Sequence, residues 1–134
     1  MTFINEQFIL NLNNGDIIDI TPKIQNFIVS LDINDAILNV SVKSNNCAVI
    51  TLDYHIAQNH DVFSLINSIT EPKIDINKGY NPDLTANIKS EVLGKNKSFS
   101  IINKQIQISD KEKIAVINCS YTVSKANVII SVVY

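Results

Sequence analysis

The sequence predicts an α+β fold of largely antiparallel β-sheets with two or three short helices. The chain has 134 residues, of which 46% are hydrophobic and 18% charged, as in one globular domain. Segments of alternating polarity outnumber segments with helical spacing. Most consecutive strands lie close enough in sequence for antiparallel pairing. Because no linker, repeat or low-complexity stretch interrupts the pattern, we expect residues 1–134 to form a single domain.

The first elements to emerge are two strands and a turn. Apolar side chains recur at period two from Phe3 to Leu12, which predicts a strand. Asn13-Asn14-Gly15 is a hairpin-type turn, because Asn and Gly tolerate positive φ. Residues 16–20 are then expected to form the returning strand.

A helix and two further strands follow. Thr21 is expected to cap the helix, with Pro22 at its first position and its end near Asp32. Strands are expected at residues 36–44 and 47–53. In the first of these strands one face is apolar, and the other becomes more polar toward its end, where a site could lie.

The remaining elements are shorter. A second helix is expected at residues 59–67, a surface loop at 77–83, and a third helix at 84–93 with Gly94 just beyond its end. The final strands are expected at residues 99–102, 105–108, 114–121 and 127–133.

The last strand is unusual because both of its faces are apolar, as Val128-Ile129-Ile130-Ser131-Val132-Val133 shows. A strand that is apolar on both sides requires cover on both sides, either from its own domain or from a neighbouring subunit. This pattern favours a homo-oligomer.

Composition and charge exclude several classes of function. The net charge is −2, and all basic residues are Lys, without a basic stripe for nucleic acid. The chain has no Arg, the residue whose rigid pair of donors binds phosphate tightly, so a tight phosphate-binding site is not expected. The N-terminus lacks the features of a signal peptide, and no apolar run approaches the roughly 18 residues of a membrane span. We therefore expect a cytoplasmic protein without membrane association.

The two cysteines, Cys47 and Cys119, have apolar neighbours. In a reducing compartment they are expected to be buried small hydrophobes, with a disulfide or reactive thiol as the alternative. His55 and His60 lack the helical spacing and the further ligands of a metal site, so no metal and no cofactor are expected.

Three charged residues are candidates for chemistry. Asp53 at a strand end and Asp61 at a helix start could divide acid and base roles, although a solvated loop Asp and a helix-dipole Asp are the favoured interpretation. Lys43 could act as a base or bind an anion, or lie on the surface. The three glycines form no phosphate loop, and no Ser/His/Asp arrangement is present.

The segment Asn87-Ile88-Lys89-Ser90-Glu91-Val92-Leu93-Gly94 resembles the YjbQ-like family, whose corresponding segment is approximately His-Ile-Lys/Arg-Ser-Ser-Leu-Leu-Gly. Val42-Lys43-Ser44-Asn45 corresponds to a family His-Thr-Ser, and Thr51-Leu52-Asp53 to Asn-Glu-Asn. Asp61 matches a family Asp. The order of elements also fits along most of the chain. The family is associated with a secondary thiamine-phosphate synthase activity.

The departures from the family bear on catalysis. Its histidines correspond here to Lys43 and Asn87, its Glu to Leu52, and its Gly-Thr-Trp-Gln to residues 109–112. An ammonium has no lone pair to replace a neutral imidazole, an amide exchanges no proton near pH 7, and Leu transfers none. A mechanism that needs this cluster is expected to be absent.

What the resemblance implies is therefore mainly shape: a homotrimer with pockets at the subunit boundaries. We first expect a catalytically degenerate protein that acts as an oligomeric scaffold or small-molecule-binding module. The alternatives are an active enzyme with a rebuilt site, using Lys43, Asp53, Asp61 and Lys89, and a ligand-binding protein without turnover. The family-equivalent pocket candidates are Lys43, Asp53, Asp61, Asn87, Lys89 and Ser90.

Overall fold

The computed structural model describes residues 1–53, 64–66, 68 and 82–134. In chain order the elements are β1 (Phe3–Leu12), β2 (Ile17–Asp19), α1 (Thr21–Leu31), β3 (Ala36–Lys43), β4 (Cys47–Asp53), α3 (Pro82–Leu93), β5 (Asn96–Ile102), β6 (Gln105–Ile106), β7 (Glu112–Asn118) and β8 (Ser124–Val133). Every strand pair is antiparallel, which confirms the predicted fold class. None of the described helices combines the length and hydrophobicity that a membrane crossing demands.

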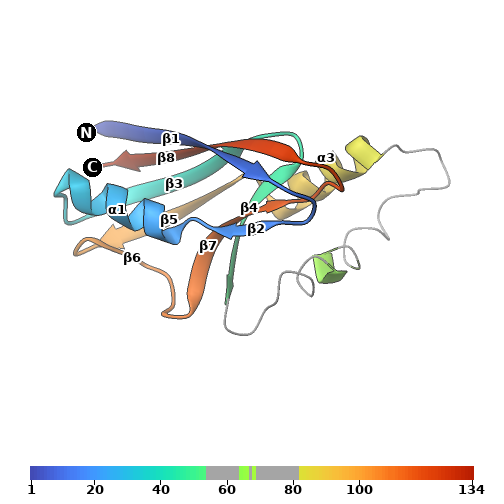
Figure 1. Cartoon of the computed structure of the whole chain (residues 1–134). Helices are drawn as coiled ribbons and strands as arrows, with labels where there is room; N and C mark the ends of the chain where they lie inside the picture. Colours follow the sequence, from blue (N-terminus) through green and yellow to red (C-terminus); the bar gives the residue numbers. More distant parts are fainter. Residues whose placement is uncertain (54–63, 67, 69–81) are drawn as a thin grey trace.

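The strands form two sheets (Figure 1). A five-stranded sheet has the order β1-β8-β3-β5-β6, and a three-stranded sheet has the order β2-β7-β4. Among the described strands, only β5 and β6 pair as sequence neighbours, so the expected pairing of most consecutive strands is wrong. The turn at residues 13–15 carries the chain from one sheet to the other instead of closing a hairpin, because β1 pairs with β8 and β2 with β7.

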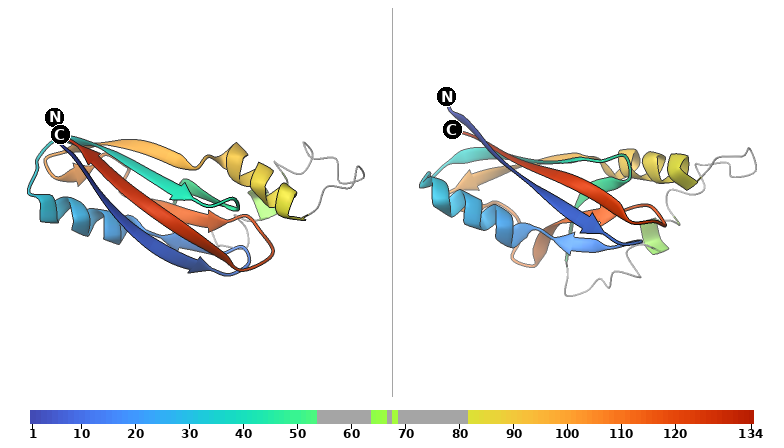
Figure 2. Two further views of the ribbon diagram at one scale, coloured as in Figure 1. Left: turned by 90° about the horizontal axis from the view of Figure 1, so that it is seen from above. Right: turned by 45° about the horizontal axis from the view of Figure 1, so that its top comes forward.

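The main core lies between the inner face of the five-stranded sheet, α1 and one face of the three-stranded sheet. Helix α1 contributes Ile24 and Ile28, and the inner face contributes Leu38, Val128 and Ile130. A second cluster covers the other face of the three-stranded sheet, where it includes Ala48, Ile66, Ile117, Cys119 and Leu93. In the described part of the chain no helix or strand covers the outer face of the five-stranded sheet (Figure 2).

The start of α1 corrects one expectation. Thr21 is the first helical residue and not the cap, since Ile20 holds the cap position without a side-chain cap bond. The Thr21 hydroxyl accepts a hydrogen bond from the Ile114 N–H at 2.8 Å and so ties the helix to β7. The helix ends at Leu31, and Asp32 follows with φ 51°, which confirms the predicted end.

Helix α3 begins at Pro82, two residues before the predicted start, and Gly94 follows it with φ 101°. The carbonyls of Gly94 and Lys95 accept hydrogen bonds from the N–H groups of Val49 and Val42, at 3.0 and 2.9 Å. The end of α3 therefore joins β4 to β3, although these strands belong to different sheets. Of the predicted helix at 59–67, the structure describes only residues 64–66, and these are helical.

A buried amide organises the turn between β7 and β8. Asn118 is fully buried, and its Nδ2 lies 3.3, 3.0 and 2.8 Å from the carbonyl oxygens of Leu12, Asn13 and Thr122. Its Oδ1 accepts from the Ser120 N–H at 3.0 Å and hydroxyl at 2.8 Å. One side chain thus fixes two turns, because a buried polar group needs all its partners.

Cys47 and Cys119 are free thiols and are buried, which confirms the expected structural role. Burial raises the pKa of the Cys119 thiol to about 12; the Cys47 thiol adds to this rise, and the Lys89 ammonium opposes it. Burial likewise raises the pKa of Cys47, against smaller effects of Ser44 and Lys95. Neither thiol resembles a reactive cysteine, whose pKa is lowered.

Replacement of the buried amide should destabilise the fold. We expect Asn118→Ala to lower the free energy of unfolding by about 2–4 kcal/mol, because several buried partners lose their hydrogen bonds. Urea denaturation monitored by circular dichroism measures this change. The exposed control Asn26→Ala should stay within about 0.5 kcal/mol of the wild type. An equal effect of the two substitutions would contradict the organising role of Asn118.

The raised pKa of Cys119 predicts a loss of stability in alkali. The folded thiol titrates near 12 and the unfolded thiol near 9.0, so the unfolded state binds fewer protons between these values. The stabilising difference is intact below pH 9 and is lost as the pH rises toward 12. At about pH 10.5 the loss should be about 2 kcal/mol. The free energies of unfolding of wild type and Cys119→Ala, plotted against pH, should therefore converge as the pH rises. Parallel curves would refute the raised pKa of Cys119.

Candidate functional site

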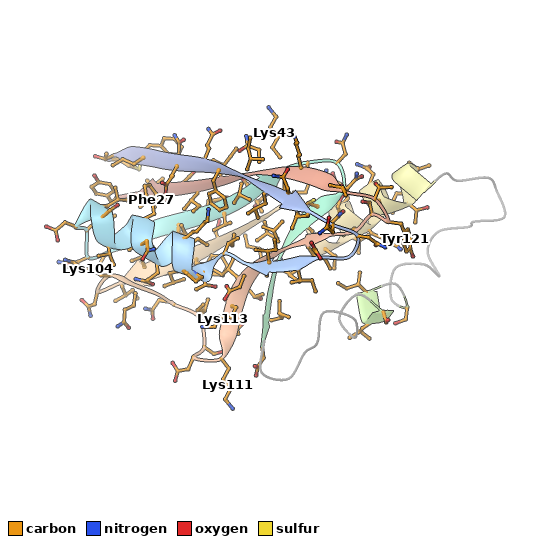
Figure 3. All side chains as sticks on the ribbon, viewed as in Figure 1. Phe27, Lys43, Lys104, Lys111, Lys113 and Tyr121 are labelled. Carbon is orange, nitrogen blue, oxygen red and sulfur yellow. The ribbon has the colours of Figure 1, made fainter. Side chains whose placement is uncertain are left out.

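The candidate residues of α3 lie at one end of the molecule, where α3 meets the β3–β4 turn (residues 44–46) and the β7–β8 turn (residues 119–123). The Asn46 carbonyl accepts from the Cys119 N–H at 2.8 Å, and Asn46 Nδ2 lies 3.3 Å from Ser124 Oγ. Figure 3 shows Tyr121 at this end, beside α3. The two turns are thus held against each other by main-chain and side-chain bonds.

Asn87 and Ser90 converge on a single acceptor, the main-chain carbonyl of Asn45. Asn87 Nδ2 donates to it at 3.1 Å, and Ser90 Oγ lies 3.1 Å from the same oxygen. The Ser90 hydroxyl is also 2.8 Å from the carbonyl of Asn87, one helical turn earlier. Ser90 is fully buried. Both predicted site residues therefore attach α3 to the β3–β4 turn.

Lys89 is fully buried, which is exceptional for a lysine. Its Nζ lies 5.5 Å from the centroid of the Tyr121 ring, within the range of a cation–π contact. Tyr121 itself is 52% exposed. Lys89 also acts electrostatically on Cys119, as its effect on the thiol pKa shows. Its charge therefore acts inside the fold.

Sequence analysis missed the role of Tyr121 and of the turn that carries it. The predicted strand at 114–121 ran through this residue, whereas β7 ends at Asn118. The signal was present, because Asn118, Ser120, Thr122 and Ser124 alternate as hydrogen-bonding residues where an apolar strand would continue. The Ser120 hydroxyl lies 2.8 Å from the Thr122 carbonyl and 3.2 Å from Ser124 Oγ. Such a run of short polar side chains is typical of a turn.

Lys43 does not join this group. It is the last residue of β3 and is exposed on the outer face of the five-stranded sheet, from which it points away in Figure 3. Its partner in the register of β8 is Asn127. Lys43 is therefore a surface residue, which was one of the two alternatives predicted from the sequence; the other was a base or an anion-binding group.

Asp53 lies at the opposite end of β4 from the Asn45–Asn46 turn. It pairs in register with Glu112 of β7, whereas Cys47 at the start of β4 pairs with Asn118. The length of β4 corresponds to about 20 Å, so Asp53 lies far from Asn87, Lys89 and Ser90, which we call the α3 cluster. Asp61, His55 and His60 lie outside the described residues. The structure thus brings Asn87, Lys89 and Ser90 together and places Lys43 and Asp53 elsewhere.

A pocket of about 290 Å³ lies between the start of α1 and the segment that connects β6 to β7. Its polar lining residues are Thr21, Gln25, Gln105, Ser109, Asp110, Glu112 and Lys113. Ile106 and Ile108 supply the apolar part. Ser109 and Glu112 shape the turn through two reciprocal bonds, from the Ser109 N–H to Glu112 Oε1 at 3.2 Å and from the Glu112 N–H to the Ser109 carbonyl at 3.0 Å.

The pocket and the α3 cluster offer different chemistry. The pocket presents two amides, two hydroxyls, two carboxylates and Lys113, which can bind a polar molecule by many hydrogen bonds. In the α3 cluster, the Ser90 hydroxyl and the Asn87 amide already form hydrogen bonds with a main-chain carbonyl. Within the described ranges, no group of three or more His, Cys, Asp or Glu side chains could hold a metal ion.

The fold is similar to those of several solved structures. A YbjQ-like protein of unknown function from Sulfolobus solfataricus P2 is 14% identical, with a TM-score of 0.84 over 98% of this chain and 96% of the other. An uncharacterised conserved protein of the yjbq/upf0047 family from Clostridium acetobutylicum is 16% identical, with a TM-score of 0.78 over 96% and 99%. These likenesses show a shared fold. No curated protein matches the chain.

A family model provides the sequence relationship. The model described as "UPF0047 protein YjbQ-like" matches residues 6–133, which includes α1, α3 and all of the described strands except the first three residues of β1. The match confirms the resemblance inferred from residues 87–94. On this ground, the chain belongs to the YjbQ-like family.

Proposed function

We propose that this chain is a catalytically inert YjbQ-like protein that acts as an oligomeric module binding a small hydrophilic molecule. The observation that carries the proposal is the convergence of Asn87 and Ser90 on the Asn45 carbonyl. Asn87, which stands where the family has a histidine, here attaches α3 to the β3–β4 turn, and we call this attachment the clamp. The oligomer expected from the sequence remains part of this proposal.

The chemistry of the other family-equivalent positions supports inertness. Leu52 stands where the family has Glu and transfers no proton. Lys43 lies on the outer sheet face, and Asp53 lies at the far end of β4. An acid–base mechanism needs its groups within hydrogen-bond reach of one substrate, and these described residues are not arranged in that way.

The pocket between α1 and the β6–β7 segment supports ligand binding. Its volume of about 290 Å³ is near the lower end of small-molecule sites, which span about 300–1,000 Å³. Residues 109–112 stand where the family has Gly-Thr-Trp-Gln, and three of them, Ser109, Asp110 and Glu112, line the pocket with polar groups. Amides and carboxylates favour a molecule rich in hydroxyl or amino groups. The alternative, an enzyme with a rebuilt site, would have to act without the α3 cluster.

The clamp predicts a stability effect at two positions. We expect Asn87→Ala and Ser90→Ala each to lower the free energy of unfolding by about 1–2 kcal/mol, because the α3-to-turn attachment weakens. The exposed Lys43→Ala should remain within about 0.5 kcal/mol of wild type. Urea denaturation measures all three. Thiamine phosphate formation by the wild type, lost in Lys43→Ala without a change in stability, would instead establish the rebuilt enzyme.

The pocket predicts a difference between two neighbouring lysines. Lys113 lines the pocket and Lys111 does not, although both lie near the β6–β7 turn (Figure 3). Native mass spectrometry of freshly purified protein should show a bound small molecule whose occupancy falls at least fivefold in Lys113→Ala and is unchanged in Lys111→Ala. Equal retention by the two variants would place the ligand elsewhere.

A negative outcome is equally definite. If the wild type carries no added mass and its melting temperature does not rise with monosaccharides, amino acids or nucleotides, ligand binding by the pocket is refuted. The stability test of Asn87 and Ser90 is independent of this result, so inertness and ligand binding are judged separately.

A further inference from the structure

The turn that carries the chain from β1 to β2 contains Asn14-Gly15, the only Asn-Gly pair in the sequence (Figure 1). The Asp16 N–H donates to the Asn13 carbonyl at 3.1 Å, so Asn14 and Gly15 are the two central residues of a β-turn. Gly15 has φ 67°, a value typical of the second central residue of a type II turn. Asn14 is exposed. An amide side chain is therefore presented to water directly before a glycine.

The two ends of this turn are held by hydrogen bonds, whereas its centre is not. The Asn13 N–H donates to Asp16 Oδ2 at 2.8 Å. Asn118 holds both ends, since its Nδ2 lies 3.0 Å from the Asn13 carbonyl and its N–H donates to the Asp16 carbonyl at 2.9 Å. Within the part of the chain that the structure describes, neither the Asn14 side chain nor the Gly15 N–H forms a hydrogen bond. Both central groups are thus available for reaction.

These two groups can react with each other, and water is the only other reactant. After a base removes its proton, the main-chain nitrogen of Gly15 attacks Cγ of Asn14. A bond forms between this nitrogen and Cγ, the bond from Cγ to Nδ2 breaks, and Nδ2 leaves as ammonia. The product is a five-membered succinimide ring. Glycine favours the attack because no Cβ hinders the approach of its nitrogen.

Water then opens the succinimide at either of its two carbonyl carbons. Attack at Cγ breaks the bond from Cγ to the Gly15 nitrogen and leaves an aspartate at position 14. Attack at the main-chain carbonyl of residue 14 breaks the other C–N bond and leaves an isoaspartate. In isoaspartate the main chain runs through the former side chain, and the former main-chain carbonyl becomes a free carboxylate.

The turn between β5 and β6 provides an internal comparison. Asn103 in this turn is also exposed, with φ 51°. The residue after it, Lys104, has a side chain, and its N–H donates to the Asn34 carbonyl at 2.9 Å. A nitrogen that is engaged in this hydrogen bond and flanked by a Cβ is poorly placed to attack Asn103. Exposure of an amide in a turn is therefore not sufficient for the reaction.

We propose that Asn14-Gly15 is a site of spontaneous covalent modification, at which this turn converts into aspartate and isoaspartate. Each product adds one negative charge close to Asp16. Isoaspartate also adds one atom to the main chain inside a turn whose two ends are bonded to Asn118. The modification therefore weakens the connection between the two sheets. This inference is independent of catalytic inertness and of the pocket ligand.

A matched pair of substitutions tests the site. Asn14→Gln and Asn103→Gln each keep an amide, but cyclisation of a glutamine requires a less favoured six-membered ring. During incubation at about pH 8, intact mass spectrometry should show wild type and Asn103→Gln gaining about 1 Da, at least fivefold faster than Asn14→Gln. Between about pH 6 and about pH 8 the rate in wild type should rise at least fivefold, because the nitrogen attacks after losing its proton.

A second measurement uses only the wild-type chain and does not depend on how a variant folds. Peptide mapping, with fragmentation that distinguishes isoaspartate from aspartate, should locate the added mass at residue 14. Urea denaturation of aged protein should show a less stable fraction that increases in proportion to the isoaspartate content. Fresh protein should unfold in a single transition.

Four results would overturn the proposal. An unchanged mass at residue 14 after prolonged incubation shows that the turn does not react. An equal rate in Asn14→Gln places the reaction at another amide. A product that contains aspartate alone excludes the change in the main chain. Aged protein that is rich in isoaspartate but as stable as fresh protein excludes a weakened connection between the sheets.

Discussion

The structure depends on the pairing of β8 with β1 on one side and with β3 on the other. β8 forms ten register pairs with β1, from Phe3 with Val133 to Leu12 with Ser124, and its inward side chains lie in the main core. Without β8 the five-stranded sheet would separate into β1 and the β3–β5–β6 group. The turn before β8 is fixed by Asn118, so one buried amide governs where this strand begins.

Alternation of polarity was sufficient to locate strands but not to pair them. β1 and the face of β3 that contains Leu38, Val40 and Val42 were predicted correctly, because one buried face imposes a period of two. The choice of partner is a property of long-range packing, to which sequence proximity is a poor guide. For this reason the residues 13–15 turn was interpreted as a hairpin, and Thr21 as a cap, although its hydroxyl accepts from Ile114 far along the chain.

The candidate site was predicted in part. Residues 87–94 identified the family, and Asn87 and Ser90 do meet the turn that follows Lys43, whereas Lys89 meets Tyr121. What no sequence pattern revealed is where their polar atoms are directed, since a serine on a helix can face a ligand or a neighbouring carbonyl equally well. The alignment with family positions placed Lys43 and Asp53 in one site, and the sheet geometry separates them because strand direction and face decide which side chains meet. The β6–β7 pocket was missed because its lining comes from α1 as well as from a polar turn.

The pairing of β1 with β8 has a consequence during biosynthesis. More than a hundred residues separate the two strands in sequence, so β1 leaves the ribosome long before β8, its neighbour among the described strands, exists. A newly made ten-residue strand with apolar side chains on alternate positions is then exposed on both edges. Contacts of this sequence separation slow folding and prolong exposure to aggregation. The edge of β1 that β8 covers in the folded protein therefore stays open until synthesis has passed residue 133.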